Sequence, residues 1–318
     1  MKILPNNFKV NDNTLLVTSK QVNKFVKIPA KHTFFLKDRE AGKSIDEHVR
    51  LLNHIAKGNY QRILAVGGGT VSDAAGYAAA VFKRGIPWDV IPTTLMGMVD
   101  AAHGGKTAIN LKAKNQVGAY HLPQNVYINT KYLDTLPERE RISGKAEIIK
   151  YAATLDIQLL AKLKGKTINI TTYIETCIKL KNYIVEHDFK EKAGLREILN
   201  YGHTLGHAFE YFSKYDLTHG ESVALGMIAE NEISVSRNWL KREDADTIKN
   251  IIIQHGLPVK YQNLKKLSVK SCKTLLKLDK KNKGNKPRFI LLHDLERTHT
   301  VDDVTDREIN LALKSVYL

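Results

Sequence analysis

A glycine turn between a strand-like run and a helix-like run is the feature that most constrains the fold of this chain. Residues 62–66 are mostly apolar, Gly67-Gly68-Gly69-Thr70 follows directly, and residues 71–82 continue with helical periodicity. Glycines let a backbone approach a phosphate, and a helix N-terminus presents free N–H groups to it. The spacing is not the G-x-G-x-x-G pattern of dinucleotide-binding proteins. The unit therefore predicts an α/β fold and leaves nucleotide binding and a purely structural turn both open.

Strand-like and helix-like runs alternate in the first part of the chain, which is typical of a parallel sheet with crossover helices. The strand-like runs are residues 14–18, 33–36 and 62–66, with a helical run at 45–55. Beyond about Pro137 helical periodicity dominates, at residues 151–155, 172–185, 199–212, 222–240 and 245–255. We therefore predict an α/β plus α protein, with a Rossmann-like parallel-sheet domain at residues 1–137 and a mainly helical domain at 138–318.

Length and composition allow two domains, each with its own core, because the chain has 318 residues of which 43% are apolar. Its longest apolar runs are far shorter than the roughly twenty residues that cross a bilayer. The N-terminus turns polar before a signal peptide can form, and the two cysteines, Cys177 and Cys272, make no disulfide framework. We expect a cytoplasmic protein without a membrane partner.

The chain is strongly basic, with 49 Lys and Arg against 33 Asp and Glu and a formal net charge of +16. Such a charge suits either nucleic acid or small anionic substrates. The densest basic run extends from Lys277 to Arg288 and carries no interleaved aromatic residues of the kind that stack on RNA bases. We interpret the lysines as a solvated surface and expect no nucleic-acid partner.

Three histidines lie close together in the sequence, at His203, His207 and His219. Residues four apart share one face of a helix, so the first two side chains lie next to each other. Isolated histidines are usually core or surface residues, whereas three neutral imidazoles together favour zinc or a similar divalent metal. A carboxylate can replace one of them, so the residues alone leave the ligand set open.

Glu147 and Lys150 are three residues apart in a helical run, a spacing ordinarily read as a surface ion pair of slight energetic value. Their context changes this interpretation, because they belong to a colinear series of motifs that resembles the 3-dehydroquinate synthase family. The series comprises Gly67-Gly-Gly-Thr-Val-Ser-Asp73, Arg84-Gly85, Ile91-Pro-Thr-Thr-Leu95, Val99-Asp100, Gly104-Gly-Lys106-Thr107, Lys114-Asn115, Thr135-Leu-Pro-Glu-Arg-Glu140, Ala146-Glu147-Ile-Ile-Lys150, Gly194-Leu-Arg196, Leu199-Asn200-Tyr-Gly-His203-Thr-Leu-Gly-His207-Ala208 and His219-Gly-Glu221.

The resemblance implies two cofactors, NAD and a divalent metal that is usually zinc, with cobalt as another choice. It assigns the metal ligands to Glu147, His203 and His219, and makes His207 a group that contacts substrate or handles a proton. The residues it places around NAD are Glu40, Lys43, Gly68, Gly69, Thr70, Asp73, Thr93, Thr94, Asp100, Lys106, Lys114, Tyr132, Thr135, Leu136 and Glu140.

The implied reaction converts 3-deoxy-arabino-heptulosonate 7-phosphate into 3-dehydroquinate and phosphate in the shikimate pathway. It proceeds by transient NAD-dependent oxidation, phosphate elimination, reduction and an intramolecular aldol closure. This anionic sugar phosphate needs cationic and polar contacts. The resemblance supplies them from Arg84, Lys106, Asn115, Lys150, Lys181, Arg196, Asn200, His207 and Lys280, with Lys281 competing for the last place. It also implies a homodimer, in which Arg84 reaches the neighbouring subunit's site.

The N-terminal part departs from the family pattern. It is short, with about two dozen residues between the first strand and Glu40, where the family usually has another helix and strand, and Ser19 replaces an acidic residue. His103 and Ala108 replace smaller or more flexible residues near the expected site. Three alternatives stay open: another sugar-phosphate cyclase with a different substrate, a metal-dependent alcohol dehydrogenase, and a catalytically silent binding protein.

Overall fold

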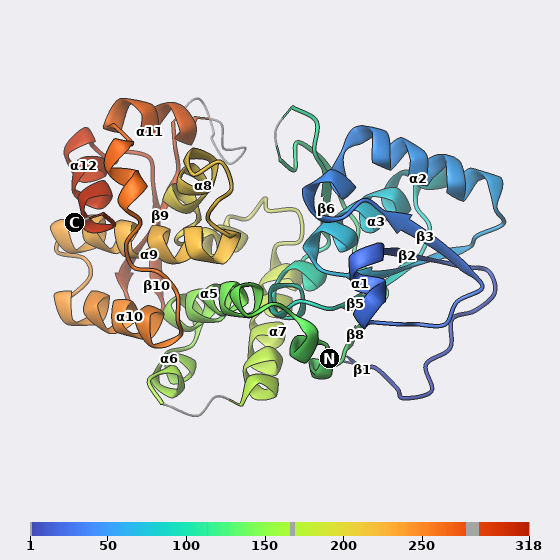
Figure 1. The fold of residues 1–318 in the computed structure, drawn as a ribbon. Coiled ribbons are helices and arrows are strands. Elements are labelled where there is room, and N and C mark those ends of the chain that lie inside the picture. The colour runs from blue at the N-terminus through green and yellow to red at the C-terminus, as the bar shows by residue number, and fades with distance from the viewer. Residues whose placement is uncertain (1, 113, 166–168, 278–285, 318) are drawn as a thin grey trace. The chain divides into compact units, whose positions relative to one another are not determined.

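The structure is a computed structural model that describes residues 2–112, 114–165, 169–277 and 286–317 (Figure 1). Contacts divide the chain into two compact units. The first contains residues 1–141 and 170–190, and the second contains residues 142–169 and 191–318. The helix α7 (Ile170–His187) was predicted within the helical domain. It groups with the first unit because it packs against α4 (Leu95–Val99) and η3 (Ala101–His103) of that unit.

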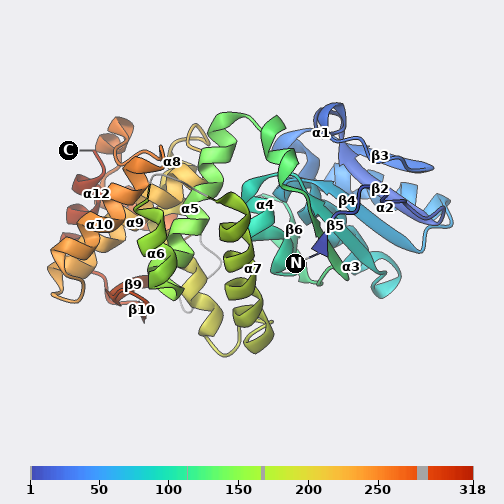
Figure 2. The same cartoon turned by 90° about the horizontal axis from the view of Figure 1, so that it is seen from below.

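The first unit is built on a six-stranded parallel sheet with the strand order β1-β8-β5-β4-β2-β3. Figure 2 shows the central strands side by side with their crossover helices. This confirms the predicted Rossmann-like domain. The strands are β1 (Lys2–Ile3), β2 (Thr14–Ser19), β3 (His32–Leu36), β4 (Arg62–Gly67), β5 (Trp88–Pro92) and β8 (Asn125–Ile128), and β6 (Lys106–Ile109) and β7 (Val117–Tyr120) form a separate antiparallel pair.

Alternate residues of the central strands enter two different cores, as a strand period of two requires. Leu15 and Ile63 point into one core, whereas Leu16 and Leu64 point into the other. The helices α2 (Ile45–Lys57) and α3 (Gly69–Val81) cover the first core, and a run of buried alanines lets α3 lie close to the sheet. The remaining elements of this unit are α1 (Lys20–Phe25), η1 (Arg39–Lys43), η2 (Phe82–Arg84), α4 (Leu95–Val99), η3 (Ala101–His103), η4 (Thr130–Thr135) and α7 (Ile170–His187).

The short N-terminal part contains one helix and one strand between β2 and Glu40. The strand β3 was predicted at residues 33–36, whereas the helix α1 was not predicted. Ser19 ends β2 and caps α1, because its hydroxyl accepts the N–H of Val22 at 3.2 Å. The helix has only six residues and buries none of its side chains fully, which explains why residues 20–25 show no clear helical period.

The second unit is mainly helical and is organised around α9 (His219–Ser236). Nearly every residue of α9 from Gly220 to Ser234 is buried, because α8, α10, α12 and β9 all pack against it (Figure 1). The other elements are α5 (Glu138–Leu155), α6 (Ile157–Leu163), η5 (Leu195–Asn200), α8 (His203–Phe212), α10 (Arg242–Gln254), η6 (Gln262–Lys266), α11 (Val269–Leu276), β9 (Phe289–Asp294), β10 (Arg297–Val301) and α12 (Asp306–Ser315).

Two details of this unit correct the predictions. The antiparallel hairpin of β9 and β10 was not predicted in a region read as helical. The helix predicted at residues 199–212 is interrupted, because η5 ends at Asn200 and α8 begins at His203. None of the helices in the described ranges combines the length and hydrophobicity that a membrane crossing requires.

Candidate metal centre and surrounding site

Glu147 and Lys150 lie in the buried middle of α5. Their side chains are 1% and 2% exposed, and they form an ion pair between Glu147 Oε2 and Lys150 Nζ. The pair is therefore not the ordinary surface ion pair that its spacing suggests. A buried carboxylate of this kind is costly to maintain unless charged partners or a metal compensate for its lost hydration.

Helix α8 presents His203 at its first position. The turn before it contains Gly202 with φ +77°, a left-handed conformation that favours glycine. A Cβ atom on Gly202 would lie 2.5 Å from Met227 Cγ and 3.0 Å from the carbonyl oxygen of Val223 on α9. This close approach breaks the predicted continuous helix and places His203 against α9.

Helix α9 presents His219, also at its first position. Thr218 is the N-cap and forms a capping box with Glu221, which fixes where the helix begins. The next residue, Gly220, donates its N–H to Ser143 Oγ of α5 at 3.0 Å, and a Cβ there would lie 1.9 Å from the carbonyl oxygen of Ser143. Glycine thus allows α9 to approach α5 one turn away from Glu147.

The three predicted ligands converge on one point. The Nε2 atoms of His203 and His219 lie 3.4 and 3.3 Å from the same oxygen, Glu147 Oε1. One ligand atom from each of the three residues lies within 4.8 Å of the others, so a single metal ion fits between them. The ring of His207 lies 5.4 Å from that of His203 and 5.9 Å from that of His219, measured between centroids. It therefore borders the cluster.

The far nitrogen of each ligand histidine faces an oxygen acceptor. Nδ1 of His203 lies 3.1 Å from the carbonyl oxygen of Tyr201, and Nδ1 of His219 lies 3.4 Å from Glu210 Oε2. Only an N–H can donate to these oxygens, so each ring carries a proton on Nδ1, and Nε2 is the nitrogen that faces the centre. Partners of this kind orient histidine ligands and raise their basicity. Sequence analysis missed Glu210, although its spacing of seven from His203 puts it on the same side of α8.

The charges of the cluster favour a cation at its centre. Burial raises the pKa of Glu147, but Lys150 and the two histidines outweigh burial and hold the pKa well below its usual value. Burial lowers the pKa of His203 to about 3. Burial also disfavours charge on His219, yet its hydrogen bonds to Glu147 and Glu210 raise its pKa to about 10. Lys150 pairs with Glu147 Oε2 and both histidines face Oε1, so positive charge gathers around this carboxylate as it would around a metal ligand.

The 3-10 helix η5 carries Arg196 and Asn200 in the same unit. Arg196 is 1% exposed, an extreme burial for an arginine, and Asn200 is partly exposed two residues before Gly202. Arg288 anchors this segment through a two-pronged ion pair with Glu197, at 2.5 and 2.8 Å. The second unit therefore holds Lys150, Arg196, Asn200 and His207 together with the three predicted ligands. Lys280 and Lys281 lie outside the described residues.

In the first unit, a buried lysine joins segments that are distant in sequence. Lys43 Nζ lies 2.5 Å from Asp73 Oδ2 and donates a hydrogen bond to Asn115 Oδ1. Burial raises the pKa of Asp73, although Lys43 opposes this shift. Glu40 accepts the Nδ2 hydrogen of Asn110 at 2.8 Å, and Lys114 Nζ lies 3.8 Å from its carboxylate. Asn115 also donates its N–H to Asn110 Oδ1 at 2.9 Å, so that five predicted residues belong to one polar network through Asn110: Glu40, Lys43, Asp73, Lys114 and Asn115.

The glycine turn between β4 and α3 meets the turn after β5. Gly68 is the N-cap of α3, and a Cβ there would lie 2.7 Å from Thr94 Cγ2. Thr93 donates its N–H to the carbonyl oxygen of Gly67 at 3.0 Å, and Thr94 caps α4 through Gly97. No heavy atom lies within 4 Å of a Cβ built on Gly69. The N-terminus of α3, where Thr70 follows, therefore faces open space beside its free N–H groups.

A second ion pair in this unit joins α7 to the end of α4. Lys181 is 6% exposed, and its Nζ lies 2.7 Å from Asp100 Oδ1.

Other predicted residues lie at the surface. Arg84 is exposed and, like Lys83 before it, has a positive φ, whereas Lys106 is exposed on β6. In and after η4, Thr135 donates its hydroxyl to the carbonyl of Tyr132 at 2.8 Å, Leu136 is partly exposed, and Glu140 is exposed at the start of α5.

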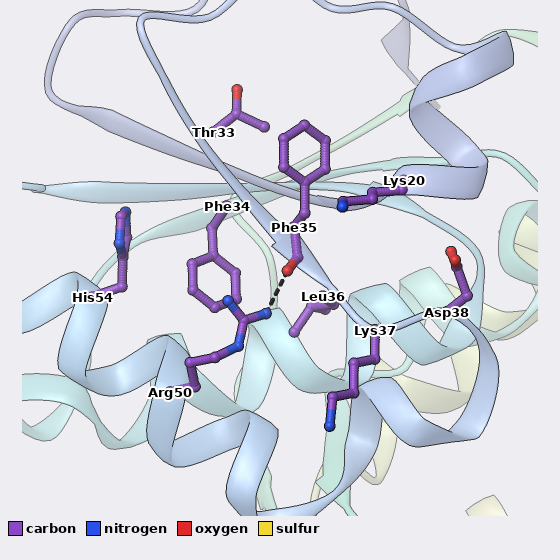
Figure 3. A pocket seen from close by; sticks show the side chains of 9 residues that line it. All are labelled: Lys20, Thr33, Phe34, Phe35, Leu36, Lys37, Asp38, Arg50 and His54. Atoms are coloured by element: carbon purple, nitrogen blue, oxygen red, sulfur yellow. Dashed lines mark hydrogen bonds between the residues drawn. The ribbon is translucent and has the colours of Figure 1, made fainter.

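A cavity of about 640 Å³ opens beside the edge strand β3 and contains none of the predicted site residues (Figure 3). Phe34, Leu36 and Arg50 are among its lining residues. The Arg50 guanidinium stacks over the ring of Phe34 at 4.1 Å and donates hydrogen bonds to Glu47 and to the carbonyl of Phe35. Arg50 thus covers a free carbonyl of the edge strand, which is one way to protect a sheet edge.

Comparisons with known proteins agree across most of the chain. Two family models match, "3-dehydroquinate synthase N-terminal" at residues 33–143 and "3-dehydroquinate synthase C-terminal" at residues 144–282. A 3-dehydroquinate synthase of Campylobacter concisus is 36% identical over 292 residues, covering 89% of this chain and 84% of that protein.

Two solved structures are also similar. The first is 2-epi-5-epi-valiolone synthase from Streptomyces hygroscopicus subsp. jinggangensis 5008 with NAD+ and Zn2+ bound, with a TM-score of 0.85, 25% identity and coverage of 95% of this chain and 89% of that one. The second is 2-deoxy-scyllo-inosose synthase complexed with carbaglucose-6-phosphate, NAD+ and Co2+, with a TM-score of 0.81, 25% identity and coverage of 96% and 91%.

Proposed function

This chain belongs to the 3-dehydroquinate synthase family, and we propose from that premise that it converts 3-deoxy-arabino-heptulosonate 7-phosphate into 3-dehydroquinate and phosphate. The observation that carries the proposal is the convergence of Glu147, His203 and His219 on one point. By their positions in the motif series, these residues match the metal ligands that the family resemblance assigns. As a reaction class, the activity is a phosphate-eliminating cyclisation by a carbon–oxygen lyase.

We propose that the three converging residues hold zinc, or cobalt in its place. Two imidazoles and one carboxylate suit either ion, and three protein ligands leave a position open for substrate. Bound there, the metal would act as a Lewis acid that acidifies a substrate hydroxyl and polarises the ketone derived from it. Tyr201 and Glu210 would keep the two imidazoles in the tautomer that ligation requires.

We propose that the first unit binds NAD. The open space beside Gly69 at the N-terminus of α3 suits the pyrophosphate, since helix N-termini favour negative charge. Around it lie the polar network of Glu40, Lys43, Asp73 and Lys114, and the Thr93–Thr94 turn. NAD would accept a hydride from the substrate and return it within one turnover. The other residues of the proposed NAD site are assigned by family position alone: Thr70, Asp100, Lys106, Tyr132, Thr135, Leu136 and Glu140.

The remaining predicted residues would hold the substrate's anionic groups and move its protons. Arg196 presents a planar donor that suits a carboxylate or phosphate, and its burial strengthens such a contact. Lys150 neutralises Glu147 and lies beside the proposed ligands. His207 borders the cluster at a position suited to proton transfer. We assign further contacts to Asn200 in the second unit and to Arg84, Lys106, Asn115 and Lys181 in the first, with Lys280 or Lys281 outside the described residues.

We also propose a homodimer in which Arg84 reaches the neighbouring subunit's site. The exposed Arg84 ends a short surface segment, as a residue that contacts another subunit should. Analytical ultracentrifugation would test this assembly. A dimer whose Arg84→Ala variant stays dimeric but loses activity supports the assignment, whereas a monomeric active enzyme contradicts it.

The test of function is phosphate release from 3-deoxy-arabino-heptulosonate 7-phosphate, measured with NAD and zinc added. We expect release that needs both, without net NADH, and that is lost on chelation and in Glu147→Gln. Glu232→Gln, which changes a carboxylate on α9 paired with Arg242, is the control and should stay active.

A second sugar phosphate decides between related functions, because the two similar structures have names that indicate other cyclisation products. Release from a hexose or a heptulose phosphate, but not from the proposed substrate, would identify another cyclase. Net formation of NADH would indicate a dehydrogenase instead. No reaction with a folded, metal-loaded protein would favour a silent binding protein.

A further inference from the structure

The N-cap residue of α8, Gly202, has no side chain that could cap the helix on which His203 lies. Helix α8 begins immediately after Gly202, and glycine carries no group that can accept the free N–H groups of the first turn. The positive φ of Gly202 and its contact with Met227 prevent any larger residue from taking this position. The helix that carries a proposed metal ligand therefore depends on another element for its cap.

Glu230 of α9 supplies this cap from outside the helix. Its Oε2 accepts the N–H of Gly202 at 2.7 Å, and its Oε1 accepts the N–H of Leu205 at 3.1 Å. The side chain is fully buried, with 0% exposure. A carboxylate at a helix N-terminus also interacts favourably with the helix dipole, and burial strengthens that interaction.

Asn231, which follows Glu230 in α9, binds Tyr201, which precedes Gly202 in the turn. The Tyr201 hydroxyl donates to Asn231 Oδ1 at 2.7 Å, and both side chains are buried. The carbonyl oxygen of the same Tyr201 faces Nδ1 of His203 at 3.1 Å and so sets which nitrogen carries the proton. Below the turn, a Cβ on Gly226 of α9 would lie 1.9 Å from the carbonyl oxygen of Gly202, which shows how closely the two backbones pack.

We infer that Glu230 is a positioning residue for the metal centre: by binding the N–H groups of Gly202 and Leu205, it fixes the start of α8 and thereby the direction of His203 Nε2 toward Glu147. Glu230 itself is not a ligand in this arrangement. The inference rests on the proposed ligand set of Glu147, His203 and His219, and it adds a residue that acts through the backbone of α8.

Removing the Glu230 carboxylate should weaken zinc binding more than it lowers the stability of the whole fold. In Glu230→Ala the two N–H groups lose their acceptors in a place that water does not reach, so the first turn of α8 should fray. Partners that orient metal ligands typically change metal affinity by about 10–100-fold, and we expect Glu230→Ala to weaken zinc binding within that range. Glu230→Gln keeps the volume and one acceptor oxygen, so its zinc affinity should be intermediate.

A matched control exists in the first unit. Glu47 is also a buried carboxylate, 2% exposed, and accepts a backbone N–H, that of Lys37, at 2.8 Å. Glu47→Ala should lower thermal stability as Glu230→Ala does, because both leave buried donors unpaired. It should leave zinc affinity unchanged, since it belongs to the other unit and touches no predicted ligand.

The experiment measures zinc affinity of the full chain by competition with a chelating indicator. The visible spectrum of added cobalt and hydrogen exchange of the Leu205 amide are recorded in parallel. The inference is supported by weaker zinc binding, an altered cobalt spectrum and faster Leu205 exchange in the Glu230 variants but not in Glu47→Ala. If Glu230→Ala does not fold, Glu230→Gln decides by the same three measurements.

Two outcomes overturn the inference and are distinguishable. Unchanged zinc affinity in a Glu230 variant whose Leu205 amide exchanges faster would show that the cap stabilises α8 without positioning His203. A wild-type chain that binds no zinc, or binds it equally well as His203→Ala, would remove the ligand set itself and with it the proposed metal-dependent function.

Discussion

At the scale of single residues, the metal centre depends on groups that are not ligands. Glu210 contacts His219 Nδ1, and Tyr201 contacts His203 Nδ1 through its carbonyl oxygen. A histidine ligand binds metal only through a deprotonated nitrogen, so contacts that hold a proton on Nδ1 leave Nε2 as the nitrogen that binds metal. The ligands and their orienting partners therefore have to be considered as one set.

We predict that Glu210→Gln weakens zinc binding by about 10–100-fold with little loss of stability. The amide is nearly the same size, but it is uncharged and presents an NH2 group as readily as an oxygen to His219. Isothermal titration with zinc measures the effect, and Glu232→Gln on the exposed pair with Arg242 is the control. Equal affinities in the two variants would contradict the role given to Glu210.

A second residue-scale prediction concerns His48, which is buried in α2 and whose ring nitrogens have no hydrogen-bond partner in the part of the chain that the structure describes. Burial lowers its pKa from 6.5 to about 4. The folded state thus keeps His48 neutral at a pH where the unfolded chain protonates it. This group does not change the stability of the fold above pH 6.5, whereas the free energy of unfolding falls by about 3 kcal/mol as the pH drops from 6.5 through 4, because only the unfolded chain then binds the proton.

His48→Leu should remove this part of the pH dependence, which urea unfolding between pH 7 and pH 4.5 would measure. The variant should lose less stability over that interval than the wild type, whereas His187→Leu at the exposed end of α7 should follow the wild-type curve. Parallel curves for His48→Leu and the wild type would show that His48 gains a partner or water in solution.

At the scale of elements, glycines at helix junctions decide how closely α5, α8 and α9 approach. Gly220 packs on Ser143 of α5, and Gly202 and Gly226 pack on each other between α8 and α9. Because each ligand lies next to one of these contacts or one turn from it, helix spacing sets the ligand spacing. The ligands come from three helices, so a small shift of any helix changes the centre.

We predict that Gly202→Ala destabilises the fold and weakens zinc binding. The left-handed conformation costs roughly 1–2 kcal/mol for a residue with a Cβ, and the 2.5 Å approach to Met227 adds strain. Thermal unfolding and zinc titration measure the two effects. Gly69→Ala is the control for stability, because no heavy atom lies within 4 Å of its Cβ position and it begins α3; a similar loss in both variants would contradict the argument.

The elements also show how well the sequence predicts local structure. Strands β2, β3 and β4 and helices α2 and α3 agree with their predicted runs to within two residues, because each has a clear period and buries one defined face. The short helix α1 and the hairpin of β9 and β10 were missed, and the 199–212 helix was drawn too long. That helix is interrupted because Gly202 packs against α9, and the helical periodicity of the local sequence contains no signal of this contact.

At the scale of the whole molecule, the two units have separate cores, so a ligand of one unit should stabilise chiefly that unit. The proposed metal ligands lie in the second unit and the glycine turn lies in the first. Binding to the native state alone stabilises it by about 2.7 kcal/mol when free ligand is a hundred times its dissociation constant. Zinc and NAD should therefore protect different parts of the chain.

We predict that zinc slows hydrogen exchange mainly in α8 and α9 and raises the unfolding temperature, and that a chelator reverses both effects. His219→Ala should abolish the response to zinc, because it removes one of three ligands. NAD should instead slow exchange at the start of α3. Hydrogen exchange with mass spectrometry measures this, and protection by zinc spread evenly over both units would contradict separate sites.

The sequence by itself determined the kinds of groups at the site and the order of the elements. Alternating strands and helices, the Gly67-Gly68-Gly69 turn and the chemistry of histidine beside a carboxylate are local properties, so they can be read from neighbouring residues. The motif order then indicated the family, which the comparisons confirmed. The residues alone left open which three groups converge.

Only the tertiary structure decided which side chains meet. Glu147 and His219 are 72 residues apart in sequence, yet their side-chain atoms lie 3.3 Å apart. Glu230 likewise caps a helix to which it does not belong. These contacts depend on how α5, α8 and α9 pack, and packing is set by buried surfaces distributed over the whole second unit. No short stretch of sequence contains both Glu230 and the turn that it caps, which is the physical reason that Glu230 could be found only in the folded chain.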